Sequence, residues 1–370
     1  MGFPNEINLN PLMGVTNGNC TNQSPWFLAQ IVTVEFLVLY GNLILTKIFP
    51  LIKWMVVLLI VTKVSSKLTM GVCKSNVCLI GKTVIVVGGN SGLGFQTALT
   101  IAGRGAKVII ADRVDSIETR KRIIHETNNT NIFYRHLDLA SLQSIRDFAS
   151  IINEEEERLD ILIHNAGAGG VNERYTKDGL LLQFQINHFG PFLLTHLLTK
   201  LLKKSAPSRI IFLSSVTAFF EDLTLESLNK SSKTNGIFNR FYTYGNTKLL
   251  SLIASNCFAE RLKGTGVTCN AVHPGLVSNM LYRTILGPKA NKVLLYFMYF
   301  ILKICGKNMY EGAQTQIHCA LSKELEGVSG RFLVDCKLFI QPKKARNSRF
   351  CDEIWRSSEA LVKLRDVERI

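Results

Sequence analysis

A tyrosine and a lysine four residues apart are the side chains in this sequence best suited to move a proton. Tyr244 and Lys248 would share one face of a helix, because residues at i and i+4 are neighbours there. An ammonium group favours tyrosinate, so we expect Lys248 to lower the phenol's pKa from about 10 toward working pH. Tyr244 could then give a proton to a developing alkoxide or take one from an alcohol. The alternative is a surface pair, and only the surrounding motifs decide between the two.

Two serines could hold the oxygen that receives or loses this proton. Ser214 and Ser215 directly follow an apolar run at 209–213 that predicts a β-strand. A hydroxyl at that strand end could hydrogen-bond a substrate oxygen and polarise it. The spacing by itself leaves open which serine acts and which has a structural part.

A glycine-rich turn lies where the pyrophosphate of a dinucleotide would bind. The run from Gly88 to Gly94 (GGNSGLG) follows a predicted strand at 83–87 and precedes a predicted helix at 95–103. Glycines let the backbone approach phosphates, and the helix amino terminus offers free N–H groups and a positive dipole end. A second strand ends at Asp112, whose carboxylate would bind a ribose 2′-hydroxyl and so favour NAD. The alternative is a tight turn that binds nothing.

The rest of the body repeats the alternation of strands and helices. Strands are predicted at 107–111, 133–137, 159–164, 209–213 and 267–272, and helices at 142–153, 180–202 and 243–262. This pattern predicts an α/β fold, a doubly wound (Rossmann) parallel sheet with helices on both faces. Polar motifs follow the strand ends: Asp138-Leu139, Asn165-Ala166-Gly167, Ser214-Ser215 and His273-Pro274-Gly275. Ligands of such sheets bind at the carboxyl ends of the strands, where we expect these motifs to meet.

An apolar segment at 26–63 predicts a membrane anchor ahead of this body. Its first part is long enough to cross a bilayer, which takes roughly 20 residues, although Glu35 lies in its middle. Pro50 and Lys53 interrupt its second part, so one span and a re-entrant pair are both open. A cleaved signal peptide is disfavoured, because a polar tail at 1–25 comes first. The alternative is a buried helical hairpin of a soluble protein.

Charge gives the anchor an expected orientation. Lysines after the apolar segment outnumber those before it, which places the body on the cytosolic side of the membrane. The sequons at Asn19 and Asn22 would accept glycans only if the tail is lumenal. The net charge of +15 is spread along the chain, with a basic C-terminal tail at 341–370, so an anionic membrane surface explains it better than nucleic acid does.

The composition excludes several classes of protein. A chain of 370 residues with 47% hydrophobic residues is not disordered, collagen-like or a disulfide-stapled mini-protein. Its nine cysteines are scattered and odd in number, and neither they nor the seven histidines show the spacing of metal ligands. We therefore expect free thiols, a reducing compartment and no metal site.

Together these motifs resemble the short-chain dehydrogenase/reductase family, and within it the membrane-associated retinol dehydrogenase-like branch. The likeness covers roughly 79–364, with a dehydrogenase/reductase domain at 79–340. The motifs that carry it, in order, are Gly88, Gly92 and Gly94, then Asn165-Ala166-Gly167, Ser215, and Tyr244-Gly-Asn-Thr-Lys248. The anchor, the long gap from serine to tyrosine, and the stretch 324–336 indicate the branch.

The resemblance implies an NAD(P)(H)-dependent alcohol dehydrogenase or carbonyl reductase. It selects Ser215 over Ser214 for the substrate oxygen, with Tyr244 as the general acid/base and Lys248 beside it. It implies that Asn187 positions a water for a proton relay. It also implies a second role for Lys248, which is to hold ribose hydroxyls. The endoplasmic reticulum membrane, a cytosolic catalytic domain and a homodimer are further expectations that follow from the resemblance.

The choice between NAD and NADP stays open in the sequence. Asp112 favours NAD, whereas Arg113 stands where this branch carries an arginine that binds the 2′-phosphate of NADP. Val87 and Asn279 replace threonines that are usual in the family and lie beside the cofactor. The full set of expected cofactor-binding residues is Gly88, Asn90, Ser91, Gly92, Leu93, Gly94, Asp112, Arg113, Asp138, Leu139, Asn165, Ala166, Gly167, Tyr244, Lys248, Pro274, Gly275 and Val277.

An apolar, aromatic stretch near 285–305 lies where the family places its substrate lid. It indicates a lipophilic substrate such as a retinoid, a steroid or another lipid, and it could also dip into the membrane surface. An ordinary buried helix is the alternative for this stretch. A catalytically silent, cofactor-binding scaffold or sensor is the alternative for the whole protein.

Overall fold

The computed structural model describes residues 35–36, 38–42, 44–171, 174–277 and 292–370. The chain divides into two compact units, Met1–Leu58 and Leu59–Ile370. The expected polar tail at 1–25 lies outside the described residues, as do Asn279 and the first part of the stretch 285–305.

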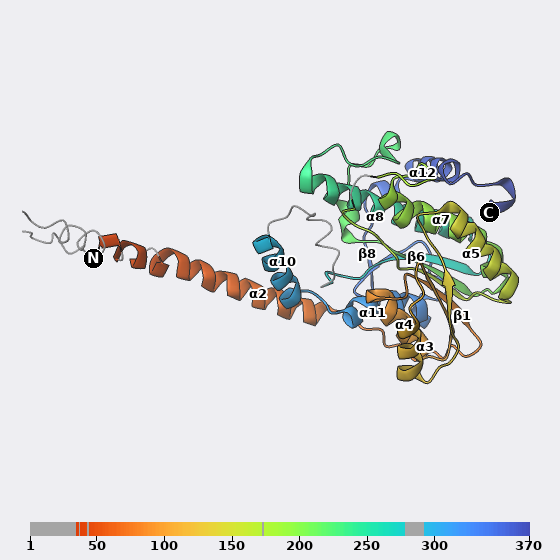
Figure 1. The fold of residues 1–370 in the computed structure, drawn as a ribbon, viewed down its shortest axis with the longest axis horizontal. Helices are drawn as coiled ribbons and strands as arrows, with labels where there is room; N and C mark the ends of the chain where they lie inside the picture. The colour runs from red at the N-terminus through yellow and green to blue at the C-terminus, as the bar shows by residue number, and fades with distance from the viewer. Residues whose placement is uncertain (1–34, 37, 43, 172–173, 278–291) are drawn as a thin grey trace, which may run out of the picture. The chain divides into compact units, whose positions relative to one another are not determined.

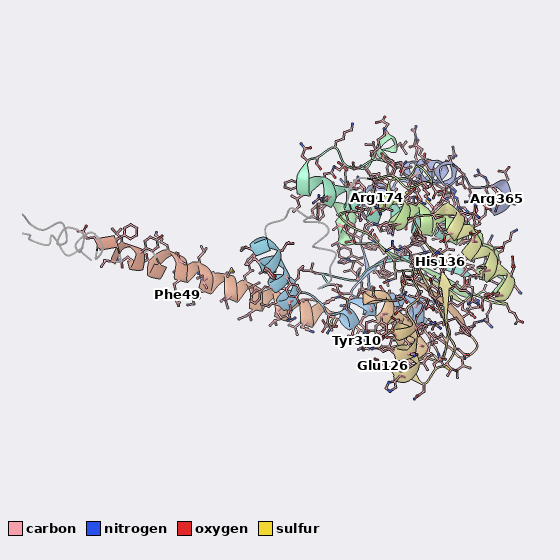
Figure 2. The ribbon with its side chains drawn as sticks, viewed as in Figure 1. Phe49, Glu126, His136, Arg174, Tyr310 and Arg365 are labelled. Carbon is pink, nitrogen blue, oxygen red and sulfur yellow. The ribbon has the colours of Figure 1, made fainter. Side chains whose placement is uncertain are left out.

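A long apolar helix occupies Val38–Thr69, and the boundary between the two units falls inside it. It contains the π-helical turn η1 (Ile44–Ile48) and α2 (Phe49–Thr69), and α2 buries none of its side chains. In Figure 2 the side chain of Phe49 points outward from this helix, in keeping with its high exposure. By length and composition alone, the helix could cross a membrane.

Pro50 does not end this helix, although the sequence suggested an interruption there. Proline in a helix clashes with the carbonyl four residues before it. The wider turn η1 occupies that place, directly before α2. Pro50 therefore lies inside one helix, Val38–Thr69.

The described residues of the body form one eight-stranded sheet in the order β3-β2-β1-β4-β5-β6-β7-β8, parallel except for β8 against β7. The strands are β1 (Thr83–Val87), β2 (Lys107–Asp112), β3 (Ile132–His136), β4 (Ile161–His164), β5 (Ser208–Leu213), β6 (Val267–His273), β7 (Phe332–Val334) and β8 (Lys337–Phe339). The order reverses direction between β1 and β4, which is the switch point where doubly wound sheets bind ligands.

Helices cover both faces of the sheet (Figure 1). The longer helices of the body are α3 (Gly92–Ala102), α4 (Ile117–Thr127), α5 (Leu142–Glu155), α7 (Gly190–Lys204), α8 (Gly236–Arg261), α10 (Lys292–Cys305), α11 (Met309–Leu321) and α12 (Ser348–Leu361). Short segments between them are α6 (Leu182–Phe184), the π turn η2 (Gln185–Phe189) and the 3-10 turns η3 (Val216–Phe219), η4 (Leu225–Ser227), η5 (Lys323–Leu325), η6 (Lys344–Arg346) and η7 (Asp366–Glu368).

Two hydrophobic clusters, one on each face, hold the layers together. Successive side chains of β1 alternate between them: Ile85 and Val87 join the cluster of α5, α7, α8 and α12, and Val84 and Val86 join that of α3, α4 and α11. All five residues of β1 are buried, as a parallel strand covered on both faces requires. The predicted doubly wound fold with helices on both faces is confirmed.

The C-terminal stretch differs from the expected basic tail at 341–370. Residues 348–361 form α12, which packs onto the body through Cys351, Ile354 and Trp355. These side chains recur at helical spacing, so one face of α12 is apolar and the basic residues lie on the other. The strands β7 and β8 were also not predicted, because a run of three residues is too short to show a period.

Candidate active site

Tyr244 and Lys248 lie on the buried side of α8, one turn apart. The Nζ atom of Lys248 is 5.7 Å from the centroid of the Tyr244 ring and donates a hydrogen bond to the carbonyl of Leu213, at 2.8 Å. Leu213 is the last residue of β5. The lysine therefore stands at the carboxyl edge of the sheet, where the sequence placed the site.

Burial dominates the pKa values of this pair. It raises the pKa of Tyr244 above its usual range and lowers the pKa of Lys248 to about 8. Burial therefore opposes the lowering of the phenol's pKa that the sequence led us to expect from Lys248, and that expected effect of Lys248 stays a prediction. In the structure the ammonium is bonded to the Leu213 carbonyl, and the phenol is removed from water.

The two serines after β5 have different parts. The hydroxyl of Ser214 donates to the backbone carbonyl of Lys248 at 2.7 Å, so it ties the strand end to α8. Ser215 caps η3, where its oxygen accepts a hydrogen bond from the Thr217 amide at 3.1 Å. Ser214 thus has the structural role expected of one of the two serines. The hydroxyl of Ser215 only accepts here, so its hydrogen can be donated to another partner.

Asn187 is held by three hydrogen bonds. Its Oδ1 atom accepts from the Ala168 amide at 2.7 Å, and its Nδ2 donates to the Ala168 carbonyl at 2.7 Å and to the Thr247 hydroxyl at 2.9 Å. A Cβ atom placed on Gly167 would lie 3.4 Å from Lys248 Nζ and 3.5 Å from Asn187 Oδ1. The motif at 165–167, the asparagine and the lysine therefore converge on one point.

A π turn sets the position of Asn187. The turn η2 leads directly into α7, and the carbonyl of Asn187 accepts a hydrogen bond from Ser251 of α8 at 3.1 Å. Single π turns inside α-helices occur often at functional sites, because they redirect side chains and free carbonyls. Sequence reasoning missed both this turn and Thr247, although Thr247 lies inside the motif from Tyr244 to Lys248.

The glycine turn has the close backbone approach that phosphate binding needs. Gly88 and Gly92 have φ values of +75° and +57°, in the region that favours glycine. A Cβ on Gly94 would overlap the carbonyl oxygen of Gly88, and Asn165 Nδ2 donates to that same oxygen at 3.1 Å. Ser91 caps α3 without a side-chain hydrogen bond, which leaves the first amides of the helix to a ligand.

The end of β2 carries both residues that bear on cofactor choice. The carboxylate of Asp112 accepts hydrogen bonds from the Arg113 amide at 2.8 Å and from the Asn90 amide at 3.3 Å. These contacts fold the glycine turn onto the end of β2 and leave the Arg113 side chain exposed. After β3, the Asp138 carboxylate accepts from the Ala140 amide at 2.9 Å, and Leu139 is buried.

The loop after β6 is braced by a lysine that sequence reasoning missed. Lys307 is buried, pairs with Asp335, and its amide donates to the Leu276 carbonyl at 2.7 Å. Its side chain lies against Gly275, and its backbone bridges to Val277. Burial, with help from Lys307, lowers the pKa of His273 to about 4. No spacing in the sequence marks Lys307, which lies thirty-two residues beyond Gly275.

A cavity in the described part of the chain lies away from these motifs. It encloses about 530 Å³ at the amino ends of the strands, among Asp160, Ser208 and Val267. Within the described part of the chain, no group of three or more His, Cys, Asp or Glu residues could hold a metal ion. The polar motifs therefore define a site at the opposite edge of the sheet from this cavity.

This fold and this arrangement define a nicotinamide-dependent dehydrogenase of the short-chain type. The model of the short chain dehydrogenase family matches residues 82–286. The chain therefore belongs to the short-chain dehydrogenase family, and within it to the retinol dehydrogenase-like branch. Retinol dehydrogenase 12 of Mus musculus is 38% identical over 294 residues, covering 79% of this chain and 90% of that one. Retinol dehydrogenase 13 of Homo sapiens is 40% identical over 300 residues, covering 80% and 89%.

Solved structures support the same fold. An uncharacterized protein from Mycobacterium Paratuberculosis superposes with a TM-score of 0.60 at 26% identity, over 78% of this chain and 95% of that one. Pseudomonas aeruginosa RhlG, in an NADP active-site complex, superposes with a TM-score of 0.53 at 24% identity, over 70% and 95%. From its family and its retinol dehydrogenase relatives, the chain is an NAD(P)-dependent enzyme that interconverts alcohols and carbonyls.

Proposed function

We propose that the protein is a membrane-anchored oxidoreductase that interconverts a lipophilic alcohol and its carbonyl, with a retinoid, a steroid or another lipid as substrate. The observation that carries the proposal is the convergence of Tyr244, Lys248 and Asn187 beside Gly167, at the strand edge that also holds the glycine turn. The relatives named retinol dehydrogenase support a lipophilic substrate, and the exposed helix Val38–Thr69 supports an anchor.

The residues present fit a nicotinamide dinucleotide. The glycine turn and the first amides of α3 would hold its pyrophosphate, Asp138 and Leu139 would flank the adenine, and Lys248 would hold ribose hydroxyls. When bound, the nicotinamide supplies or accepts the hydride. The loop with Pro274, Gly275 and Val277, which Lys307 braces, would support that end of the cofactor.

Each catalytic side chain has a stated task. Ser215 donates a hydrogen bond to the substrate oxygen and polarises it. Tyr244 gives its phenolic proton to that oxygen in reduction and takes a proton from the alcohol in oxidation. Because burial raises the pKa of Tyr244, the lowering that proton exchange requires must come from Lys248 in its charged form and from the positive charge of the oxidised nicotinamide.

Asn187 is assigned a positioning part. Its side-chain amide joins the segment at Ala168 to Thr247, and the Thr247 hydroxyl donates to the backbone carbonyl of Tyr244 at 2.8 Å. This chain of contacts fixes α8 against the motif at 165–167. The water relay expected for Asn187 stays a prediction, as do the other site assignments.

Two observations bear on the choice between NAD and NADP. The Asp112 carboxylate lies at the end of β2, where it would accept from a ribose 2′-hydroxyl, whereas Arg113 beside it is exposed and could pair with a 2′-phosphate. The variant Arg113→Ala separates the two. If NADP is used, its KM rises about tenfold while that of NAD is unchanged. An unchanged KM for NADP would mean that Arg113 does not bind the 2′-phosphate, so that Asp112, which favours NAD, decides the cofactor.

A substrate screen tests the proposed function. Membrane preparations of the full chain are given a panel of lipid alcohols and carbonyls with each cofactor, and the nicotinamide absorbance is followed. Tyr244→Phe should lose turnover and keep cofactor binding, and Tyr242→Phe is the matched control because no lysine lies four residues after it. If the wild-type chain turns over nothing while it binds the cofactor, the protein is a cofactor-binding scaffold.

The anchor's orientation needs its own experiment. Lysines after the helix favour a cytosolic catalytic domain and a lumenal tail, and the endoplasmic reticulum is the expected membrane. Glycosidase treatment should then remove a glycan from Asn19 or Asn22, and added protease should digest the catalytic domain of intact microsomes. Protection of that domain would contradict this orientation.

A further inference from the structure

The helix α10 exposes its apolar side instead of burying it. Val293, Tyr296, Phe297 and Phe300 lie at helical spacing with exposed fractions of 75%, 73%, 48% and 56%. Leu302 and Cys305, toward the other side of the helix, are buried. A helix on the surface of a soluble domain normally turns charged residues outward. Here the outward stripe is aromatic, and apart from the terminal Lys292 the helix carries only Lys303 as a charged residue.

The base of α10 is fixed beside the candidate active site. The Lys307 amide donates to the Leu276 carbonyl at 2.7 Å, and Lys307 bridges to Val277 as in a parallel strand pair. Gly306 packs directly against Leu276 and Leu302. Leu276 and Val277 belong to the loop that follows Pro274 and Gly275. The aromatic stripe therefore belongs to a helix whose carboxyl end meets the expected nicotinamide loop.

The same end of α10 meets the last turns of the long apolar helix. The thiol of Cys305 lies 3.8 Å from the carbonyl of Leu59, in hydrogen-bonding geometry. Further along, Lys67 forms an ion pair with Glu311 at the start of α11. Both contacts lie within the unit Leu59–Ile370. The segment 59–69 is thus attached to the catalytic body next to α10.

The charges around this junction fit an anionic lipid surface. Lys63, Lys67 and Lys303 are all partly or fully exposed, and the Lys303 ammonium lies 6.0 Å from the centroid of the Tyr299 ring. Tyrosine rings and lysines beside an apolar stripe are typical of helices that lie in the interface between water and lipid. Glu311 is the carboxylate nearest to Lys67, and that ion pair already occupies it.

We propose that α10 lies in the membrane surface, with the stripe Val293, Tyr296, Phe297 and Phe300 in the lipid, beside the point where the anchor leaves the bilayer. The inference rests on the proposed membrane anchor. A bilayer is favoured over a second protein copy because Cys305 of α10 contacts Leu59 of α2, and α2 buries no side chain and belongs to a helix apolar enough to cross a membrane. A lipophilic substrate dissolved in the bilayer would then meet the protein next to the loop at 274–277.

Photolabelling from the lipid phase tests this directly. The full chain is reconstituted in phosphatidylcholine vesicles with about one fifth phosphatidylserine and a phospholipid that carries a photoactivatable acyl chain. Trypsin cleavage after Lys292 and Lys303 releases Val293–Lys303 as one peptide. We expect its labelling to exceed that of Val114–Arg120, which carries the exposed Val114 and Ile117, by about tenfold or more.

The anchor provides an internal standard. Cleavage after Lys53 and Lys63 releases Trp54–Lys63, which must be labelled if α2 is in the membrane. If this peptide is labelled and Val293–Lys303 is not, the inference on α10 is overturned while the anchor stands. If neither is labelled, the proposed anchoring fails and the inference fails with it.

A triple variant gives a functional readout. Tyr296→Ser, Phe297→Ser and Phe300→Ser together should raise the KM for a carbonyl presented in vesicles about tenfold or more, and should leave the KM for a water-soluble short aldehyde unchanged. The control variant, Val114→Ser with Ile117→Ser, should change neither value. An equal rise for both substrates would mean that α10 only shapes the pocket, which would contradict the membrane role.

Discussion

Two long helices of this protein use apolar side chains in opposite ways. The helix α8 buries most of its residues from Thr243 to Ala259, including the lysine and tyrosine of the candidate site. The helix α2 buries none, although its hydrophobicity is greater. In α8 the buried ammonium of Lys248 meets a protein partner, the Leu213 carbonyl. In α2 the apolar side chains are not buried by protein, so the stability of this helix depends on what surrounds them outside the protein.

A lysine introduced into each helix in place of a leucine should give the largest contrast. Leu250→Lys puts an unpaired charge into the core cluster and should cost roughly 5 kcal/mol of the free energy of unfolding, enough to unfold the domain. Leu51→Lys in α2 should leave urea unfolding of the catalytic domain unchanged and reduce membrane insertion by about 3 kcal/mol. Urea titration and vesicle flotation measure the two. Equal destabilisation of the domain would show that protein covers α2.

Lys248→Met should separate activity from stability. We expect turnover to fall about a thousandfold or more, roughly 4 kcal/mol in the activation free energy. The fold should become more stable by up to about 3 kcal/mol at pH 7, because the pKa of Lys248 is lowered by burial from 10.5 to about 8. The cost of charging this lysine is fully present below pH 8 and disappears as the pH rises toward 10.5.

An exposed lysine of α2, Lys53, is the control for this prediction. Lys53→Met removes the same charge from an exposed position and should change neither turnover nor the urea midpoint. Loss of stability in Lys248→Met at pH 7 would mean that the hydrogen bond to Leu213 outweighs the burial of the charge.

Glycine to alanine should have opposite effects in the two helices. A Cβ on Gly245 of α8 would overlap the carbonyl of Phe220, so Gly245→Ala should cost about 3 kcal/mol and displace Tyr244 beside it. Gly41, in the helix Val38–Thr69, has nothing within 4 Å of that position, and Gly41→Ala should raise helix stability by up to about 1 kcal/mol. Thermal unfolding in detergent measures both changes.

Acid should weaken the packing around α8. His196 is enclosed by the rings of Phe192, Phe258 and Trp355 at 4.7, 5.1 and 4.9 Å, and burial lowers its pKa to about 3. Because the unfolded chain takes up a proton below pH 6.5, stability is lost as the pH falls from 6.5 toward 3. The loss is about 2 kcal/mol for this residue by pH 5.

His196→Phe should remove that part of the pH dependence. Urea midpoints measured from pH 7 to pH 5 should fall less steeply in the variant than in the wild-type chain. His164 and His188, whose pKa values burial also lowers to about 3, would still contribute. If the urea midpoints of the two chains fall in parallel between pH 7 and pH 5, His196 does not contribute to the pH dependence.

Thr247→Val should give the smallest of these effects. It removes the hydroxyl that joins Asn187 to the Tyr244 carbonyl and keeps the shape of the side chain. We expect kcat to fall about tenfold, near 1.4 kcal/mol, with KM for the cofactor unchanged. Thr247→Ser should restore kcat, since a hydroxyl is present again. An unchanged kcat in the valine variant would show that this contact does not position Tyr244.

The parts of the site that the sequence predicted differ from the parts it did not in one respect, the separation along the chain between the residues that interact. The glycine turn, the tyrosine with its lysine, and the serine pair were all visible because each lies within a few residues and follows a strand or occupies one helix. Thr247 and Lys307 were not, since their partners Asn187 and Leu276 are far away in sequence and join them only through hydrogen bonds. The doubly wound fold was likewise readable, because apolar runs and polar strand ends repeat, whereas the strand order came only from the structure.

Sequence alone determined the class of fold, the edge of the sheet where chemistry can occur, and the presence of a segment too apolar to leave in water. Only the tertiary structure decided the burial of the Tyr244 phenol, the folding of the last thirty residues onto the body, and the outward stripe of α10. These depend on which atoms surround a group, and burial is a property of the packed chain. A run of residue types cannot show whether its apolar side will be covered by protein or left facing outward.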